Sequence, residues 1–120
     1  MTNKVNLSEK LAAVTEYWSP KIVGELNNQH VKIVKLNGSF VWHHHKNEDE
    51  LFLVLKGKLK IHQKDKTVHV NEGEFYIVPK GVEHKPAADE EVHVLLFEPA
   101  DTLNTGNVKN EMTVNNPERI

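Results

Sequence analysis

The segment WHHHKNEDE at residues 42–50 constrains this chain most, because it contains three consecutive histidines and ends in a glutamate. In an extended chain successive side chains point to opposite faces, so His43 and His45 share one face and His44 takes the other. The polar residues that follow are typical of a turn, and the apolar run after Glu50 is typical of a second strand. Pairing of the two strands brings Glu50 beside both imidazoles. Two neutral nitrogens and one carboxylate on one face favour a divalent transition metal.

Composition excludes several other kinds of site. The 120 residues contain no cysteine, which excludes disulfides, thiolate zinc sites and cysteine nucleophiles. The net charge of -2 and the lack of a basic block argue against nucleic acid as a partner. The first residues lack an apolar signal region and no later apolar run is long enough to span a bilayer, so we expect a cytoplasmic protein with no membrane partner. Eight histidines are the one unusual count, and that excess favours a metal site.

Apolar periodicity predicts one short helix followed by many short strands. Residues 7–18 have helical spacing, with Ser8 as a candidate N-cap. From Lys21 onward the period becomes two, and turns rich in asparagine, glycine and proline separate the apolar runs. Strands are therefore expected at residues 21–26, 31–36, 40–45, 50–55, 59–63, 67–70, 75–78 and 92–97. Such a series indicates an antiparallel sandwich or barrel, followed by a loop-rich tail with at most one docked strand at 111–114.

The strand expected at 50–55 is apolar on both faces. Phe52 and Val54 share the phase of Glu50, so we expect them to line the pocket together with Val41. A strand that is apolar on both faces needs cover on both. One short helix covers little area, so we expect a homodimer that buries the outer face, which carries Leu51, Leu53 and Leu55.

A second segment, GEFYIVPKGVEH at residues 73–84, places another histidine near the first pair. A strand ends there in a Pro-x-Gly turn at 79–81, and the chain enters another strand at His84. Such a turn can return His84 to the interior that holds His43 and His45. A single His-x-His in a strand is more often exposed to solvent than bound to metal, so the second segment decides the interpretation.

These two segments resemble the two motifs of the cupin superfamily. The first motif combines a glycine, His-x-His, a glutamate and a later glycine, and it is matched by His43, His45, Glu50 and Gly57. The entry glycine, Gly38, stands one residue closer to the histidines than is usual. The second motif is matched by Gly73, Pro79, Gly81 and His84, whereas the asparagine that often follows is replaced by Ala88. The resemblance covers about residues 38–88, with matching strands to about 98, and is greatest to small single-domain microbial cupins.

The resemblance implies a double-stranded β-helix, or jelly-roll, barrel in one domain, with its core at about 21–98 and a tail at 99–120. It also implies one divalent transition metal per chain (iron, manganese, nickel or zinc), bound inside the barrel by His43, His45, Glu50 and His84. Three imidazoles and a carboxylate leave one or two octahedral positions open for water, substrate or dioxygen. The alternative is a barrel that keeps the pattern and uses its cavity without metal.

From this site we expect a metal-dependent enzyme that acts on a small molecule by a dioxygenase, isomerase or lyase type of reaction. A non-catalytic small-molecule-binding or sensor protein is the alternative, because one barrel carries many functions. A metal-free epimerase-like use of the barrel is disfavoured, because that chemistry needs no glutamate at Glu50. The only arginine is Arg119 in the tail, which favours a neutral or weakly acidic substrate over a strongly anionic one. No catalytic acid or base stands out by position.

The remaining histidines are expected outside the metal site. His44 faces away from it, and Trp42 shares that outward phase, which indicates packing or a dimer contact. Alternation leaves the direction of His93 open. Exposed positions are expected for His30, His62 and His69.

Overall fold

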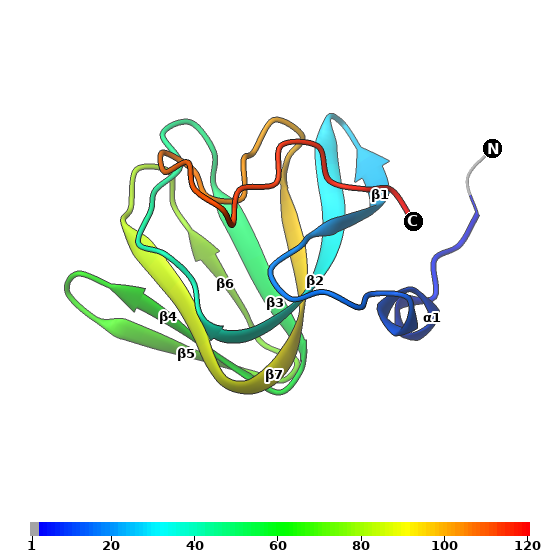
Figure 1. Ribbon diagram of the computed structural model, residues 1–120, viewed down its shortest axis with the longest axis horizontal. Coiled ribbons are helices and arrows are strands. Elements are labelled where there is room, and N and C mark those ends of the chain that lie inside the picture. Colours follow the sequence, from blue (N-terminus) through cyan, green and yellow to red (C-terminus); the bar gives the residue numbers. More distant parts are fainter. Residues whose placement is uncertain (1–2) are drawn as a thin grey trace.

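The computed structural model describes residues 3–120, and in it one short helix packs against a strongly curved antiparallel sheet (Figure 1). The elements are α1 (Leu7–Ala12), β1 (Lys21–Leu26), β2 (Gln29–Ser39), β3 (Glu50–Lys56), β4 (Lys58–Gln63), β5 (Thr67–Asn71), β6 (Phe75–Val78) and β7 (His84–Pro99). The predicted all-β architecture with a short N-terminal helix is therefore confirmed. Among the described residues there is no helix long and apolar enough to cross a membrane.

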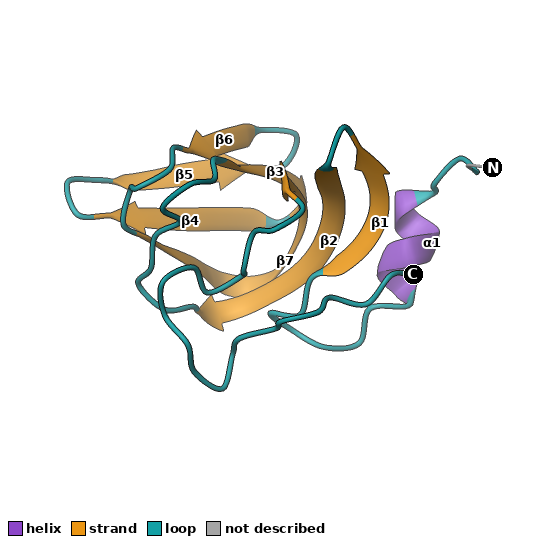
Figure 2. Ribbon diagram, turned by 90° about the horizontal axis from the view of Figure 1, so that it is seen from above, coloured by secondary structure: helices purple, strands orange, loops and turns teal. Residues whose placement is uncertain are grey.

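Strand β7 is the central element of the fold. Its first part pairs with β4, and its later part pairs with β2 on one side and β3 on the other, in the order β1-β2-β7-β3-β6. Figure 1 shows β7 descending on one side of the molecule, turning at the base and rising on the other. Figure 2 shows the β4–β5 hairpin at one end of the molecule and β1 with α1 at the other. A single strand thus belongs to both halves of the sheet.

The continuity of β7 corrects one expectation. We expected a strand only at 92–97, but β7 begins at His84 and runs unbroken through the acidic residues 89–91. The acidic side chains of Asp89, Glu90 and Glu91 are exposed at the bend, which explains why the sequence there is polar. Strand β2 pairs with Ala88 and Val92, with a register shift between them, so pairing on both sides of residues 89–91 outweighs their low strand propensity.

The core fills the space between the two halves of the sheet. Strand β3 alternates as predicted, with Glu50, Phe52 and Val54 buried, and β7 alternates in the same way from Val92 onward. Aliphatic side chains supply most of the buried area, and hydrophobic burial of this kind contributes roughly 1.5–3 kcal/mol per large side chain. The main cluster comprises Val34, Leu36, Phe52, Val54, Leu59, Ile61, Val70, Val78, Ala88, Val92, Val94 and Leu96.

The N-terminal helix is shorter than predicted. It ends at Ala12, and the N-cap is Asn6 rather than Ser8, because the Asn6 Oδ1 accepts the hydrogen bond from the third helical N–H at 3.1 Å. Trp18 lies beyond the helix with a φ of 60°, and its indole N–H donates to the carbonyl of Asn37 at 2.9 Å. The helical spacing of Trp18 therefore does not reflect a helix.

One predicted strand is not formed, and the tail contains no strand at 111–114, where the sequence allowed one. Residues 40–45 make only the isolated antiparallel bridge between His43 and His84, and they cross from β2 to β3 without a continuous partner strand. Residues 111–114 form turns and irregular backbone. In both segments the residue pattern suits a strand, but the fold supplies no neighbouring strand for a ladder.

Gly57 closes the tight turn between β3 and β4. Its φ is +93°, and a Cβ there would lie 3.1 Å from the carbonyl oxygen of Glu91 and 3.3 Å from the Cα of Val92. We predict that Gly57→Ala lowers the free energy of unfolding by about 2–4 kcal/mol, because a left-handed backbone costs about 1–2 kcal/mol and crowding adds a similar amount. The control is Gly73→Ala, where φ is +83° and nothing lies within 4 Å, so only the backbone cost applies. Urea denaturation measures both, and equal losses would contradict the role of crowding.

Candidate metal centre

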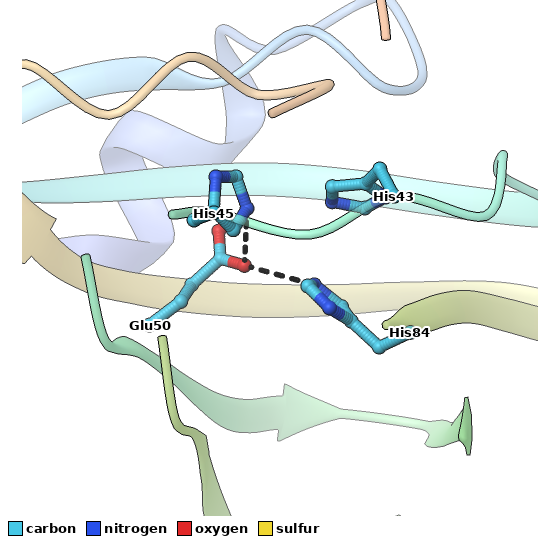
Figure 3. Close-up of side chains that lie close together, drawn as sticks. All are labelled: His43, His45, Glu50 and His84. Carbon is cyan, nitrogen blue, oxygen red and sulfur yellow. Dashed lines mark ion pairs between the residues drawn. The ribbon is translucent and has the colours of Figure 1, made fainter. Parts of the chain in front are cut away.

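The four predicted ligand residues, His43, His45, Glu50 and His84, converge inside the barrel. Each offers one ligand atom, and these atoms lie within 4.8 Å of one another. Figure 3 shows the three imidazole rings and the carboxylate gathered around a common space. Their exposed fractions are 2%, 3%, 4% and 0% respectively, so the cluster is shielded from bulk solvent.

The backbone brings these residues together from segments far apart in the sequence. Glu50 begins β3 and His84 begins β7, while His43 and His45 lie in the irregular segment before β3. The backbones of His43 and His84 exchange two hydrogen bonds, of 3.0 and 2.8 Å, and the N–H of Gly81 donates to the carbonyl of His45 at 2.7 Å. As predicted from alternation, both histidines point inward and His44 is only half-buried.

The tautomers of two histidines in the cluster follow from their hydrogen bonds. The Nδ1 atom of His43 lies 2.9 Å from the carbonyl oxygen of Val41, and the Nδ1 of His84 lies 2.9 Å from that of Val82. A carbonyl oxygen only accepts, so in both rings Nδ1 carries the proton and Nε2 keeps its lone pair. Carbonyl partners of this kind orient histidine ligands in metal sites.

Several buried atoms of the cluster have no hydrogen-bond partner among residues 3–120, namely both ring nitrogens of His45, the Oε1 of Glu50 and the Nε2 of His84. The Glu50 Oε1 lies 3.2 Å from the Nε2 of His45 and 3.4 Å from that of His84, so charge attracts these groups although their alignment is poor for hydrogen bonds. Unpaired buried polar atoms are costly. A cation among them gives a partner to the Oε1 of Glu50, the Nε2 of His84 and one ring nitrogen of His45, and three imidazoles with one carboxylate fit a divalent transition metal.

The protonation states also suit metal binding. Burial lowers the pKa of His43 to about 4, and the nearby His84 ring acts in the same direction. Burial acts to raise the pKa of Glu50, but the His45 and His84 rings beside it outweigh that effect and hold the pKa well below its usual value. At neutral pH the His43 ring is therefore neutral and Glu50 is ionised, which are the forms that bind a metal.

A buried ion pair beside the cluster was missed by the sequence analysis. The Lys32 Nζ lies 2.7 Å from the Glu98 Oε2, and the two side chains are only 3% and 2% exposed. Burial raises the pKa of Glu98 well above its usual value, and the neighbouring Glu50 raises it further. One signal was present in the sequence, because Glu98 shares the buried phase of Val94 and Leu96.

A mostly apolar cavity adjoins the cluster. Of the predicted lining residues Phe52 contributes, whereas Val54 is fully buried in the core and Val41 is half-buried; neither lines the cavity in the part of the chain that the structure describes. Sequence reasoning missed an aromatic wall, in which the rings of Trp18 and Phe40 stack with centroids 4.8 Å apart and planes 7° apart. The full lining is Trp18, Pro20, Val34, Leu36, Phe40, His43, Glu50, Phe52, Pro86, Leu96, Glu98 and Asn104.

The remaining histidines lie outside the cluster. His30 corrects an expectation: it is buried at 8% exposure, and its Nε2 lies 3.5 Å from an oxygen of Glu25. His93 points away from the interior, with its Nε2 2.7 Å from the Glu91 Oε2. His69 is exposed as expected, and His62 is half-buried.

Trp42 packs on the outside of the ligand segment. Its ring is half-buried, and the Nζ of Lys64 lies 4.1 Å from the ring centroid. This cation–π contact gives the ring a partner within its own chain.

Comparisons with known proteins identify the barrel. The family model described as "Cupin domain" matches residues 30–98. The sequence is 37% identical over 70 residues to Uncharacterized protein YdbB of Bacillus subtilis, a stretch that covers 58% of this chain and 62% of that relative. The chain thus spans less than two thirds of that relative's length.

Two solved structures are similar over most of the chain. The cupin-2 domain containing protein from Shewanella frigidimarina has 42% sequence identity and a TM-score of 0.78, over 79% of this chain and 93% of that one. Protein NMB1881 from Neisseria meningitidis has 32% identity and a TM-score of 0.74, over 81% of this chain and 99% of that one. These likenesses support the fold.

The lowered pKa of His43 predicts how stability depends on pH. Between its ordinary value of 6.5 and its folded value of about 4, the unfolded chain binds a proton that the folded chain does not. The free energy of unfolding of metal-free protein should therefore fall as the pH falls through this window, by at most about 3 kcal/mol from this group. Urea denaturation in excess chelator at several pH values measures the slope. A His43→Gln variant with the same slope would contradict the assignment.

Proposed function

The chain belongs to the cupin family, and from that membership we propose that it is a metal-dependent enzyme whose one divalent transition metal is held by His43, His45, Glu50 and His84. The predicted small microbial cupin, with a jelly-roll barrel and a short helix, is confirmed. The observation that carries the proposal is the convergence of four buried ligand atoms within 4.8 Å beside a cavity.

The protein prepares this site in three ways. Carbonyl groups fix the tautomers of two histidines, so that Nε2 is available in each. Glu50 supplies one negative charge to offset part of a divalent charge. The apolar walls exclude water, which strengthens electrostatic interactions within the cavity. When bound, the ion would supply a Lewis acid with open positions for an oxygen atom of a small molecule.

The cavity lining supports a small neutral or weakly acidic substrate with an apolar body. The stacked rings of Trp18 and Phe40 give a flat apolar wall. Glu50 and Glu98 also line the cavity and disfavour polyanions, and the buried Lys32 is already paired with Glu98. Dioxygenase, isomerase and lyase reactions share one requirement that this cavity meets, a substrate oxygen bound to an ion in a dry pocket.

A homodimer is proposed from the outer face of β3 and β6. Leu51 pairs with Ile77 and Leu53 with Phe75, so these four side chains share one face of the sheet. Phe75 is 62% and Ile77 46% exposed, and both lie on β6, a strand that pairs only with β3 among residues 3–120. The helix covers a different part of this face, where it packs near Ile33 and Leu55. A second copy that covers the β3–β6 face would bury these side chains.

The first test of the proposed function is metal content. We predict about one equivalent of a transition metal per chain in untagged protein, and a loss of most of it in His84→Ala, because a buried ligand is removed. His69→Ala is the matched control, since His69 is exposed on the β4–β5 hairpin and should leave the content unchanged. Plasma mass spectrometry measures all three proteins. If the wild-type protein is free of metal even after incubation with iron, manganese, nickel or zinc, the metalloenzyme hypothesis is contradicted. The alternative, a barrel that binds a small molecule without metal, would then stand.

The dimer has a separate test. Ile77→Lys should convert a dimer into a monomer, because it places a charge in the centre of the proposed apolar contact. Leu26→Lys is the control: Leu26 is 49% exposed at the end of β1, the strand at the opposite end of the sheet order. Sedimentation velocity distinguishes the two states. The proposal is contradicted if the wild-type protein sediments as a monomer at high concentration as well as after a roughly 50-fold dilution.

A further inference from the structure

The segment at residues 101–114 lies against the loop that carries two of the metal ligands. It follows β7 and lies beyond residues 30–98, which match the cupin domain. In Figure 1 it is the orange to red chain that crosses the top of the barrel. No ligand atom of the cluster comes from it, although its Asn104 lines the adjoining cavity, so its effect on the ligands themselves acts through the ligand loop.

The contact is made at the residue between the two ligands. The backbone N–H of His44 donates to the Asn107 Oδ1 at 2.9 Å, and the N–H of Asn107 donates to the carbonyl of His44 at 3.1 Å. Gly106 lies directly beside them, and a Cβ at that position would collide with the carbonyl oxygen of His44 and lie 3.1 Å from the Cδ2 of His43. Only glycine permits this approach.

The segment is held in shape by its own side chains. The Asn104 side chain donates to the carbonyl of Met112 at 2.9 Å and accepts from the N–H of Val114 at 2.8 Å. The Thr105 and Thr113 hydroxyls are 2.7 Å apart, and Thr105 is fully buried. These bonds join residues 104–105 to residues 112–114 and so close the segment into a loop. Residues 106 and 107 lie within this loop and are held in place by it.

We propose that residues 101–114 are a strap that holds the ligand loop in its metal-binding conformation, with Asn107 and Gly106 as positioning residues. Fixing both backbone groups of His44 fixes the peptide planes on either side of it, and these planes aim His43 and His45. Metal binding and strap order are then coupled, and the coupling is reciprocal: the strap raises metal affinity, and metal stabilises the strap. This inference rests on the proposed metal site.

The test compares two asparagines of the same strap. Asn107→Ala removes the acceptor for the His44 N–H, whereas Asn110→Ala removes an acceptor for the N–H of Met112, within the strap itself. Co²⁺ is the probe, because its visible absorption reports coordination geometry. Competition with a chromogenic chelator should show roughly tenfold weaker Co²⁺ binding and an altered visible spectrum for Asn107→Ala, as is typical when a group supporting a ligand is lost. For Asn110→Ala, affinity within twofold of wild type and an unchanged spectrum are expected.

Gly106→Ala provides a stronger perturbation in the same direction. Its added methyl group must push the His44 carbonyl away, so we expect a larger loss of Co²⁺ affinity than for Asn107→Ala. Affinities and spectra equal to wild type in both variants would overturn the strap. Wild-type protein that binds no Co²⁺ would instead count against the proposed function, so the two failures are distinguishable.

Hydrogen exchange on the wild-type protein tests the reciprocal effect and needs no variant. Addition of Co²⁺ should slow exchange in the peptide that contains the N–H of Asn107, which is bonded to the His44 carbonyl. The helix α1 is the control, because it packs on the outer face of the sheet near Ile33 and Leu55, at the end of the molecule opposite the β4–β5 hairpin (Figure 2). If the strap peptide exchanges at the same rate with and without bound Co²⁺, the coupling is overturned. This result needs only wild-type protein, so it holds even if a variant fails to fold.

Discussion

The backbone pairing of β7 is the interaction on which the rest of this structure depends. The strand joins β4 at its start to β2 and β3 along its length, so its hydrogen bonds hold both halves of the barrel in one register. Its first residue is His84, one of the four residues of the cluster, and Glu98 near its end lies beside Glu50, another of them. A one-residue slip would turn both side chains to the outside. The register that closes the barrel is therefore the register that assembles the site.

The site concentrates charge where a folded chain ordinarily avoids it. Glu50, Glu98 and Lys32 are all at most 4% exposed, and burial of such groups is costly unless each is paired. Lys32 offsets the charge of one carboxylate directly at 2.7 Å, but the Glu50 Oε1 and the His84 Nε2 stay without hydrogen-bond partners in the described chain. Burial of the apolar side chains around them offsets this free-energy cost. A cation bound there would offset part of it, and metal binding would then stabilise the folded barrel.

The sequence predicts what depends on local alternation and misses what depends on distant pairing. His43, His45 and Glu50 point inward because side chains alternate in any extended segment, and the Pro-x-Gly turn returns His84 to them. The continuity of β7 through Asp89 was missed because it comes from β2 and β4, which local sequence does not reveal. Lys32 was overlooked because its burial depends on a partner 66 residues away. The helix was predicted to extend to Trp18 because this residue has helical spacing from Leu7, Leu11 and Val14, but it lies in an irregular segment after the helix ends at Ala12.

The ligand loop shows why a wrong strand prediction still yielded the right side-chain directions. In a strand, successive residues bond to neighbours on alternate sides. His43 bonds to His84 on one side, His44 bonds to Asn107 on the other, and the carbonyl of His45 bonds to Gly81 on the first side again. The loop therefore has the hydrogen bonds of a central strand, although its partners are a strand start, a turn and the strap. These backbone bonds of residues 43–45 come from three different segments, so the directions of the histidine side chains depend on all three together.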